Sequence, residues 1–212
     1  MLWVILWAVL GLGFGALAYA LVYRLTRKQC KPAILACALL FAGMMIFTQS
    51  PTVVFISLFA FILLTISLID WYTQEIPDGL LLVAIAIGAV WVVLGNITEI
   101  FPHAPGFLDA GLGILAGAVP LLAIDRLVLV LAKKDGFGYG DVKLMATAGL
   151  FLGWSNIFAA FIFAFIAGGI YAACLLLTGR ARRGEYIAFG PFLCGGIIAA
   201  LWFGQAFWNL LT

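Results

Sequence analysis

The chain has 212 residues, of which 66% are hydrophobic and only 9% are charged. Soluble globular domains carry about 25% charged residues, so this composition excludes a soluble domain, a disordered chain and a secreted disulfide scaffold. The net charge of +2 is too small to indicate nucleic-acid binding. The composition therefore predicts a protein that crosses a lipid bilayer several times.

Apolar runs divide the chain into eight segments, each of which we expect to be a membrane helix. The alternating ten-residue pattern of an outer-membrane barrel is missing, so we predict an all-α bundle that forms a single domain over residues 1–212. A spanning helix needs about 20 residues, and the second and sixth runs are shorter. The segments cover residues 2–24, 33–48, 52–69, 79–95, 108–132, 140–154, 156–178 and 187–211.

The basic residues predict the orientation of these segments. The loops after the second, fourth and sixth segments contain no Lys or Arg. Because basic loops remain in the cytoplasm, the loops that carry these residues are predicted to be cytoplasmic and both chain ends to face outward. The eleven basic residues are Arg24, Arg27, Lys28, Lys31, Arg126, Lys133, Lys134, Lys143, Arg180, Arg182 and Arg183.

Two acidic residues adjoin apolar runs on the predicted cytoplasmic side. Asp70 ends the third segment, and Asp141 opens the sixth directly after Gly138-Tyr139-Gly140. Ionisable groups at such positions are costly and indicate function by default, although ordinary helix termination is an alternative. The only histidine, His103, lies in a predicted outer loop, where we interpret it as a solvated residue rather than a ligand.

The two carboxylates are predicted to have different electrostatic surroundings. A helix C-terminus disfavours the carboxylate of Asp70, whereas free backbone N–H groups at a helix N-terminus favour that of Asp141. If the two side chains meet, these surroundings suit one carboxyl group to act as an acid and the other as a base. We weakly prefer Asp141 as the base and Asp70 as the acid.

Four neighbouring residues are candidates for supporting or binding roles. Gly138 and Gly140 let backbone approach backbone, so an extended substrate strand could lie along them. Asp78 suits either the N-cap of the fourth segment or a catalytic role. Lys143 is either an interfacial anchor or a partner for Asp141 and a substrate anion. The glycine spacing matches neither a phosphate-binding loop nor a dinucleotide fingerprint.

These motifs resemble a known family. Asp70 with Ile76-Pro77-Asp78, and the run from Gly138 to Lys143, look like the two signatures of type IV prepilin peptidases, which are GxGD-type intramembrane aspartic proteases. Two further stretches resemble the family's first and last helices: Gly13-Phe14-Gly15 followed by Tyr23-Arg24-Leu25, and Phe189-Gly190-Pro191-Phe192.

The resemblance implies an activity, a substrate and a location. The substrate would be a prepilin or pseudopilin with a basic leader and a hydrophobic stem, as in type IV pilus and type II secretion systems. Leader cleavage would occur at the cytoplasmic face of the bacterial inner membrane. Asp70 and Asp141 would be the catalytic pair, and neither a metal nor a cofactor would be needed.

One departure from the family concerns its second activity. Many bacterial members carry a cytoplasmic insertion with paired CxxC motifs after the first helix, and they methylate the new N-terminus using S-adenosylmethionine. Here the corresponding connection runs only from Thr26 to Pro32 and holds a single cysteine, Cys30. We therefore expect no inserted zinc-type domain, and N-methylation is in doubt.

Two other classes of function are compatible with the same residues. A small transporter or ion-conducting protein would use Asp70 and Asp141 as a proton or cation path. However, transporter sites lie near the bilayer midplane, and both acids are predicted at one face. An assembly scaffold would use its glycine-rich helices only for packing. The sequence predicts no oligomeric state.

Overall fold

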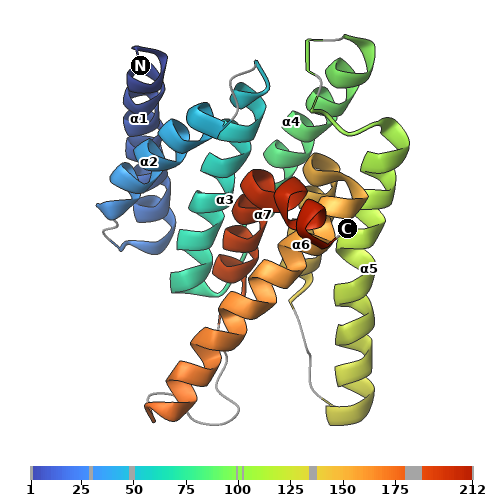
Figure 1. Ribbon diagram of the computed structural model, residues 1–212. Helices are drawn as coiled ribbons and strands as arrows, with labels where there is room; N and C mark the ends of the chain where they lie inside the picture. The colour runs from blue at the N-terminus through green and yellow to red at the C-terminus, as the bar shows by residue number, and fades with distance from the viewer. Residues whose placement is uncertain are drawn as a thin grey trace.

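The computed structural model describes residues 2–28, 31–47, 51–98, 100–101, 103–133, 138–179 and 188–211, and every regular element in these ranges is an α-helix. Six of the seven helices are long and apolar enough to cross a membrane, and α2 is shorter. The chain is therefore an all-helical, multi-pass membrane protein, as its composition predicts. The helices in Figure 1 are α1 (Leu2–Thr26), α2 (Pro32–Phe47), α3 (Val53–Thr73), α4 (Asp78–Ile97), α5 (Phe107–Ala132), α6 (Tyr139–Leu177) and α7 (Gly190–Leu211).

The sixth and seventh predicted segments are the two halves of α6, which is broken at Gly153. This residue has φ 72° and ψ 179°, a conformation that glycine adopts readily and other residues avoid. The first half lies antiparallel to α5, because the backbone of Gly117 touches Met145 near its start and Gly113 touches Gly149 near its end. The chain then reverses and returns alongside α7, with Ala160 against Gly196. Figure 1 shows this reversal.

A carboxylate from α5 anchors the break in α6. Asp109 lies in the first turn of α5, and its Oδ1 accepts a hydrogen bond from the backbone N–H of Trp154 at 3.0 Å. Free N–H groups at the start of a helix need such an acceptor. A Cβ on Gly153 would collide with the same carboxylate, so the reversal and its cap fit together only with glycine at the break.

The chain runs back and forth through the bundle. The α1 and α2 helices are antiparallel, with Gly11 against the backbone of Ala38. The α1 and α3 helices are parallel, because Trp7 donates a hydrogen bond to Ser57 at 3.0 Å and the later Val22 packs with Ile69. The α3 helix ends where α4, α6 and α7 begin. We call this end of the bundle the Asp70 end.

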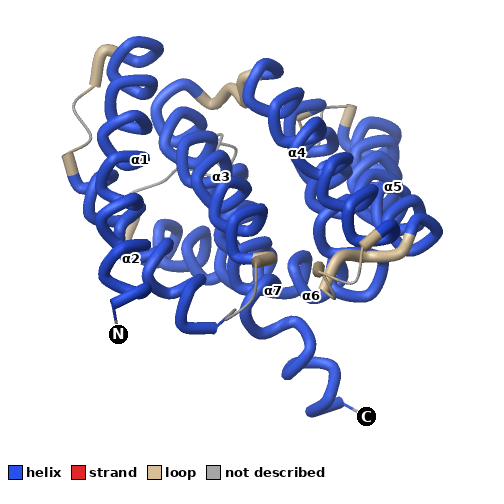
Figure 2. The backbone as a smooth tube through the Cα atoms, turned by 90° about the horizontal axis from the view of Figure 1, so that it is seen from above, coloured by secondary structure: helices blue, strands red, loops and turns tan. Residues whose placement is uncertain are grey.

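The α3 helix lies at the centre of the bundle. Within its most apolar window 61% is buried, the largest share among the six candidate spans. The views in Figures 1 and 2 place α1 and α2 on one side of it and α4 and α5 on the other. The ring of Phe59 on α3 stacks on that of Phe151 on α6, with centroids 3.8 Å apart. This central position buries Asp70, whereas the three residues that follow it in α3 are exposed.

We expect the contact between α5 and α6 to tolerate no side chain at Gly113. An added Cβ would lie 2.9 Å from the carbonyl carbon of Gly153 and closer still to Gly149. Overpacking of this kind costs about 1–3 kcal/mol, so Gly113→Ala should lower the apparent melting temperature in detergent.

The matched control lies two residues earlier on the same helix. A Cβ on Gly111 would meet nothing within 4 Å, so Gly111→Ala should be neutral or stabilising by up to about 1 kcal/mol. Equal melting temperatures for the two variants would contradict the proposed close contact.

Candidate active site

Asp70 lies in the last turn of α3 and is only 5% exposed. The helix extends to Thr73, four residues beyond the predicted segment end at residue 69. It ends where Gln74 takes a left-handed conformation with φ 56° and donates its N–H to the carbonyl oxygen of Asp70 at 2.8 Å. The side chain needs partners of its own, since a buried carboxylate is stable only when it is hydrogen-bonded or paired.

Asp70 finds that partner at the beginning of α7. The N–H of Gly190 donates to Asp70 Oδ2 at 3.1 Å, and a Cβ on Gly190 would lie 2.5 Å from the same oxygen. The C-terminus of α3 is expected to disfavour this carboxylate, and the N-terminus of α7 supplies a compensating donor. The sequence analysis did not select Gly190 as a site residue, although a glycine before Pro191 at a helix start was a usable signal.

Asp141 lies in the first turn of α6, as predicted. Its backbone N–H donates to the carbonyl oxygen of Gly138 at 3.0 Å, and its side chain is hydrogen-bonded to the backbone of Gly138. The lack of a side chain at Gly140 also matters, because a Cβ there would lie 3.0 Å from the Cβ of Ile76. The two predicted glycines therefore hold the start of α6 close to the loop that follows α3.

The carboxyl groups of Asp70 and Asp141 interact electrostatically. The two residues are distant in the sequence, and the bundle brings them together at the Asp70 end. Cys194, one turn into α7, is buried near both aspartates. The sequence alone does not show that this cysteine lies there, because its position depends on which face of α7 turns toward α3.

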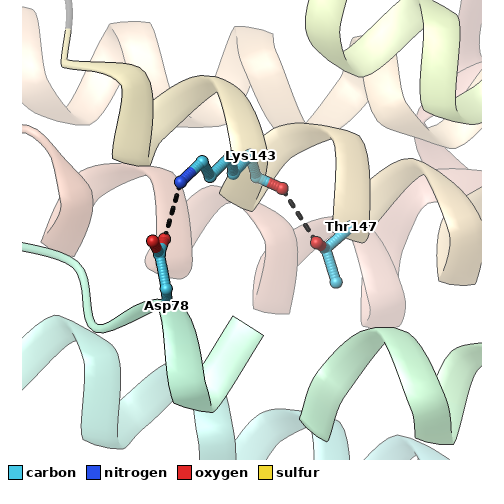
Figure 3. Close-up of polar contacts among 3 residues, drawn as sticks. All are labelled: Asp78, Lys143 and Thr147. Atoms are coloured by element: carbon cyan, nitrogen blue, oxygen red, sulfur yellow. Dashed lines mark hydrogen bonds and ion pairs between the residues drawn. The ribbon is translucent and has the colours of Figure 1, made fainter. Parts of the chain in front are cut away.

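The remaining two candidates form an ion pair with each other. Lys143 Nζ lies 2.8 Å from Asp78 Oδ1, and both side chains are exposed; Figure 3 shows the pair. Lys143 also accepts a hydrogen bond at its backbone oxygen from Thr147. The pairing links the start of α4 to the first turn of α6. The sequence leaves Lys143 as either an interfacial anchor or a partner for Asp141, and in the structure its ammonium group pairs with Asp78.

The predicted N-cap role of Asp78 is wrong. Asp78 is the first residue of α4, Pro77 is the N-cap, and no side chain caps this helix. Its carboxylate pairs with Lys143 instead. Ile76 and Asp78 thus contact Gly140 and Lys143, on either side of Asp141 in the sequence. We call these two contacts the loop clamp.

The chemistry available at the Asp70 end is that of two carboxyl groups. An ionised carboxylate can take a proton from water while a protonated one donates to a carbonyl oxygen. No group of three His, Cys, Asp or Glu side chains that could hold a metal occurs in the ranges that the structure describes. His103 is exposed and lies in the loop between α4 and α5, at the opposite end of the bundle.

Comparison with known proteins identifies the family. Residues 57–173 match the model of the type IV leader peptidase family. Three similar proteins are each called prepilin leader peptidase/N-methyltransferase. The protein of Burkholderia pseudomallei (strain 1026b) is 35% identical over 70% of this chain and 46% of its own length. That of Escherichia coli (strain K12) is 35% identical over 79% and 68%, and that of Pseudomonas aeruginosa is 35% identical over 68% and 47%.

The chain thus spans about half the length of most of these relatives. No solved structure matches it significantly. The matched region begins in α3 and ends in the second half of α6, and it includes both aspartates and the loop clamp. By this match over more than half of its length, the chain belongs to the type IV leader peptidase family.

Proposed function

We propose that this protein is a membrane-embedded aspartic endopeptidase that removes the basic leader of prepilin-like proteins at the cytoplasmic face of the bacterial inner membrane. The observation that carries the proposal is that Asp70 and Asp141, from distant parts of the chain, lie at one end of the bundle, near enough for their carboxyl groups to interact electrostatically. Membership of a leader peptidase family supports the substrate class. N-methylation is left out of the proposal, because the connection between α1 and α2 is short.

The proposed reaction needs one proton shared by two carboxyl groups. The ionised aspartate takes a proton from water, whose oxygen attacks the carbonyl carbon of the scissile bond. The protonated aspartate donates to the carbonyl oxygen. Collapse of the tetrahedral intermediate then breaks the C–N bond: the leaving amine takes the proton from the aspartic acid formed in the first step, and the other aspartate takes back a hydroxyl proton as the carbonyl re-forms. We assign Asp141 as the base and Asp70 as the acid, although the titration belongs to the pair.

The catalytic roles predict the effect of removing either acid. Asp70→Asn and Asp141→Asn keep the size of each side chain but remove the group that transfers the proton. We expect each to abolish leader cleavage, a loss of at least about 10²–10⁴-fold, when the purified protein acts on a prepilin peptide in vesicles. Glu75→Gln changes an exposed carboxylate in the loop between α3 and α4 and should leave the rate unchanged. Normal cleavage by either aspartate variant would refute the mechanism.

Gly190 is proposed as a positioning residue for Asp70. A methyl group on Gly190 would displace the carboxyl group that its own N–H holds, and a shift of about 1 Å at a reacting group costs about 10²-fold in rate. Gly190→Ala should therefore lower kcat strongly with little change in KM. Gly195→Ala adds a methyl group to the same helix where nothing lies within 4 Å, and it should cleave normally. Similar kcat values for the two variants would count against the role.

The loop clamp is proposed to hold the two aspartate-bearing elements in register. Exposed ion pairs contribute about 0.2–1 kcal/mol, so Asp78→Asn or Lys143→Gln should each reduce kcat by less than about tenfold. Since both variants break the same contact, the double variant should lose no more activity than either single variant. A loss in the double variant equal to the product of the two single losses would show that Asp78 and Lys143 act independently.

A further inference from the structure

A polar cavity lies at the opposite end of the bundle from the aspartates. Its volume is about 490 Å³. Trp91 on its wall is 13 residues along α4 from Asp78, which at 1.5 Å per residue corresponds to about 20 Å. The wall also includes the region where α6 reverses and the loop between α4 and α5. The cavity is therefore separate from the proposed peptidase site.

The wall of this cavity carries a carboxylate. Asp109 lies on it, together with the amides of Asn156 and Gln205 and the imidazole of His103. Neither Lys nor Arg occurs among the described residues that line it. Asp109 Oδ1 already accepts the N–H of Trp154, but a carboxylate offers about four acceptor positions, so it can bind a further donor. The wall thus favours a cation that carries N–H groups.

Two indoles give the cavity a second property. Trp91 and Trp202 both line it, and indole faces attract ammonium groups. Trp91 is 1% exposed, and its indole N–H is buried without an acceptor among the described residues. A buried donor without an acceptor is costly. The same site that attracts a cation therefore offers one N–H for an oxygen of the ligand.

We propose that this cavity binds a primary ammonium group, carried either by the headgroup of an aminophospholipid or by a soluble amine. Asp109 and the indole of Trp202 hold the ammonium group, and the N–H of Trp91 donates to a phosphate or ester oxygen when the ligand is a lipid. The position supports a lipid, because the cavity lies where α3 begins and α4 ends, and tryptophans concentrate at the headgroup level of membranes.

The test measures binding to the full-length protein in detergent by calorimetry. The probes are a short-chain phosphatidylethanolamine, the matching phosphatidylglycerol, and ethanolamine. We expect the phosphatidylethanolamine to bind at least about tenfold more tightly than the phosphatidylglycerol. Binding of ethanolamine with similar affinity identifies a soluble amine as the source, whereas binding of the lipid alone identifies the headgroup.

Two conservative variants connect the binding to the proposed contacts. Asp109→Asn keeps an oxygen acceptor for Trp154 and removes only the charge, so it should weaken binding at least about tenfold. Trp91→Phe keeps an aromatic ring and removes the N–H, so it should weaken lipid binding and leave ethanolamine binding unchanged. Glu75→Gln, at the Asp70 end, should bind normally. Equal affinity for the two lipids, unchanged binding by Asp109→Asn, or no binding of either amine would overturn the proposal.

Discussion

The site depends on the hydrogen bond between the N–H of Gly190 and the carboxyl group of Asp70. Asp70 is buried at the C-terminus of the most buried helix, where the backbone dipoles oppose a negative charge. The N-terminus of α7 meets it there and supplies a donor. Asp141 lies at the N-terminus of its own helix. Each carboxyl group therefore lies beside free backbone N–H groups, although Asp70 is at the end of α3 and Asp141 is at the start of α6.

Close approach at glycines, to side chains in two places and to a backbone in a third, makes this arrangement possible. Gly190 touches Asp70, Gly140 touches Ile76, and Gly113 touches Gly149. In a membrane the hydrophobic effect does not drive helices together, so small residues that allow close approach do more of this work. The loop clamp then ties the start of α4 to the start of α6 with one exposed ion pair. This ion pair contributes little to stability, but it joins two particular residues, Asp78 and Lys143.

The sequence predicts the helices, the alternating direction in which they cross the membrane, and the positions of both aspartates next to helix ends. These features depend on apolar runs and basic loops that can be read from the sequence. It did not predict Gly190 at the site, since this residue reaches Asp70 only through the packing of α7 on α3. It also did not single out Asp78 as the partner of Lys143, because Asp141 is nearer in the sequence, whereas Asp78 is the carboxylate that the ammonium group reaches in space.

The reversal at Gly153 decides on which side of the membrane the rest of the chain lies. As one straight helix, the 39 residues of α6 would extend about 58 Å, nearly twice the hydrocarbon thickness of about 30 Å. The following segment would then emerge on the far side, and Gly190 would be a membrane's width away from Asp70. The backbone conformation of Gly153 thus sets the topology of everything after it, and with it whether Gly190 lies on the same side of the membrane as Asp70.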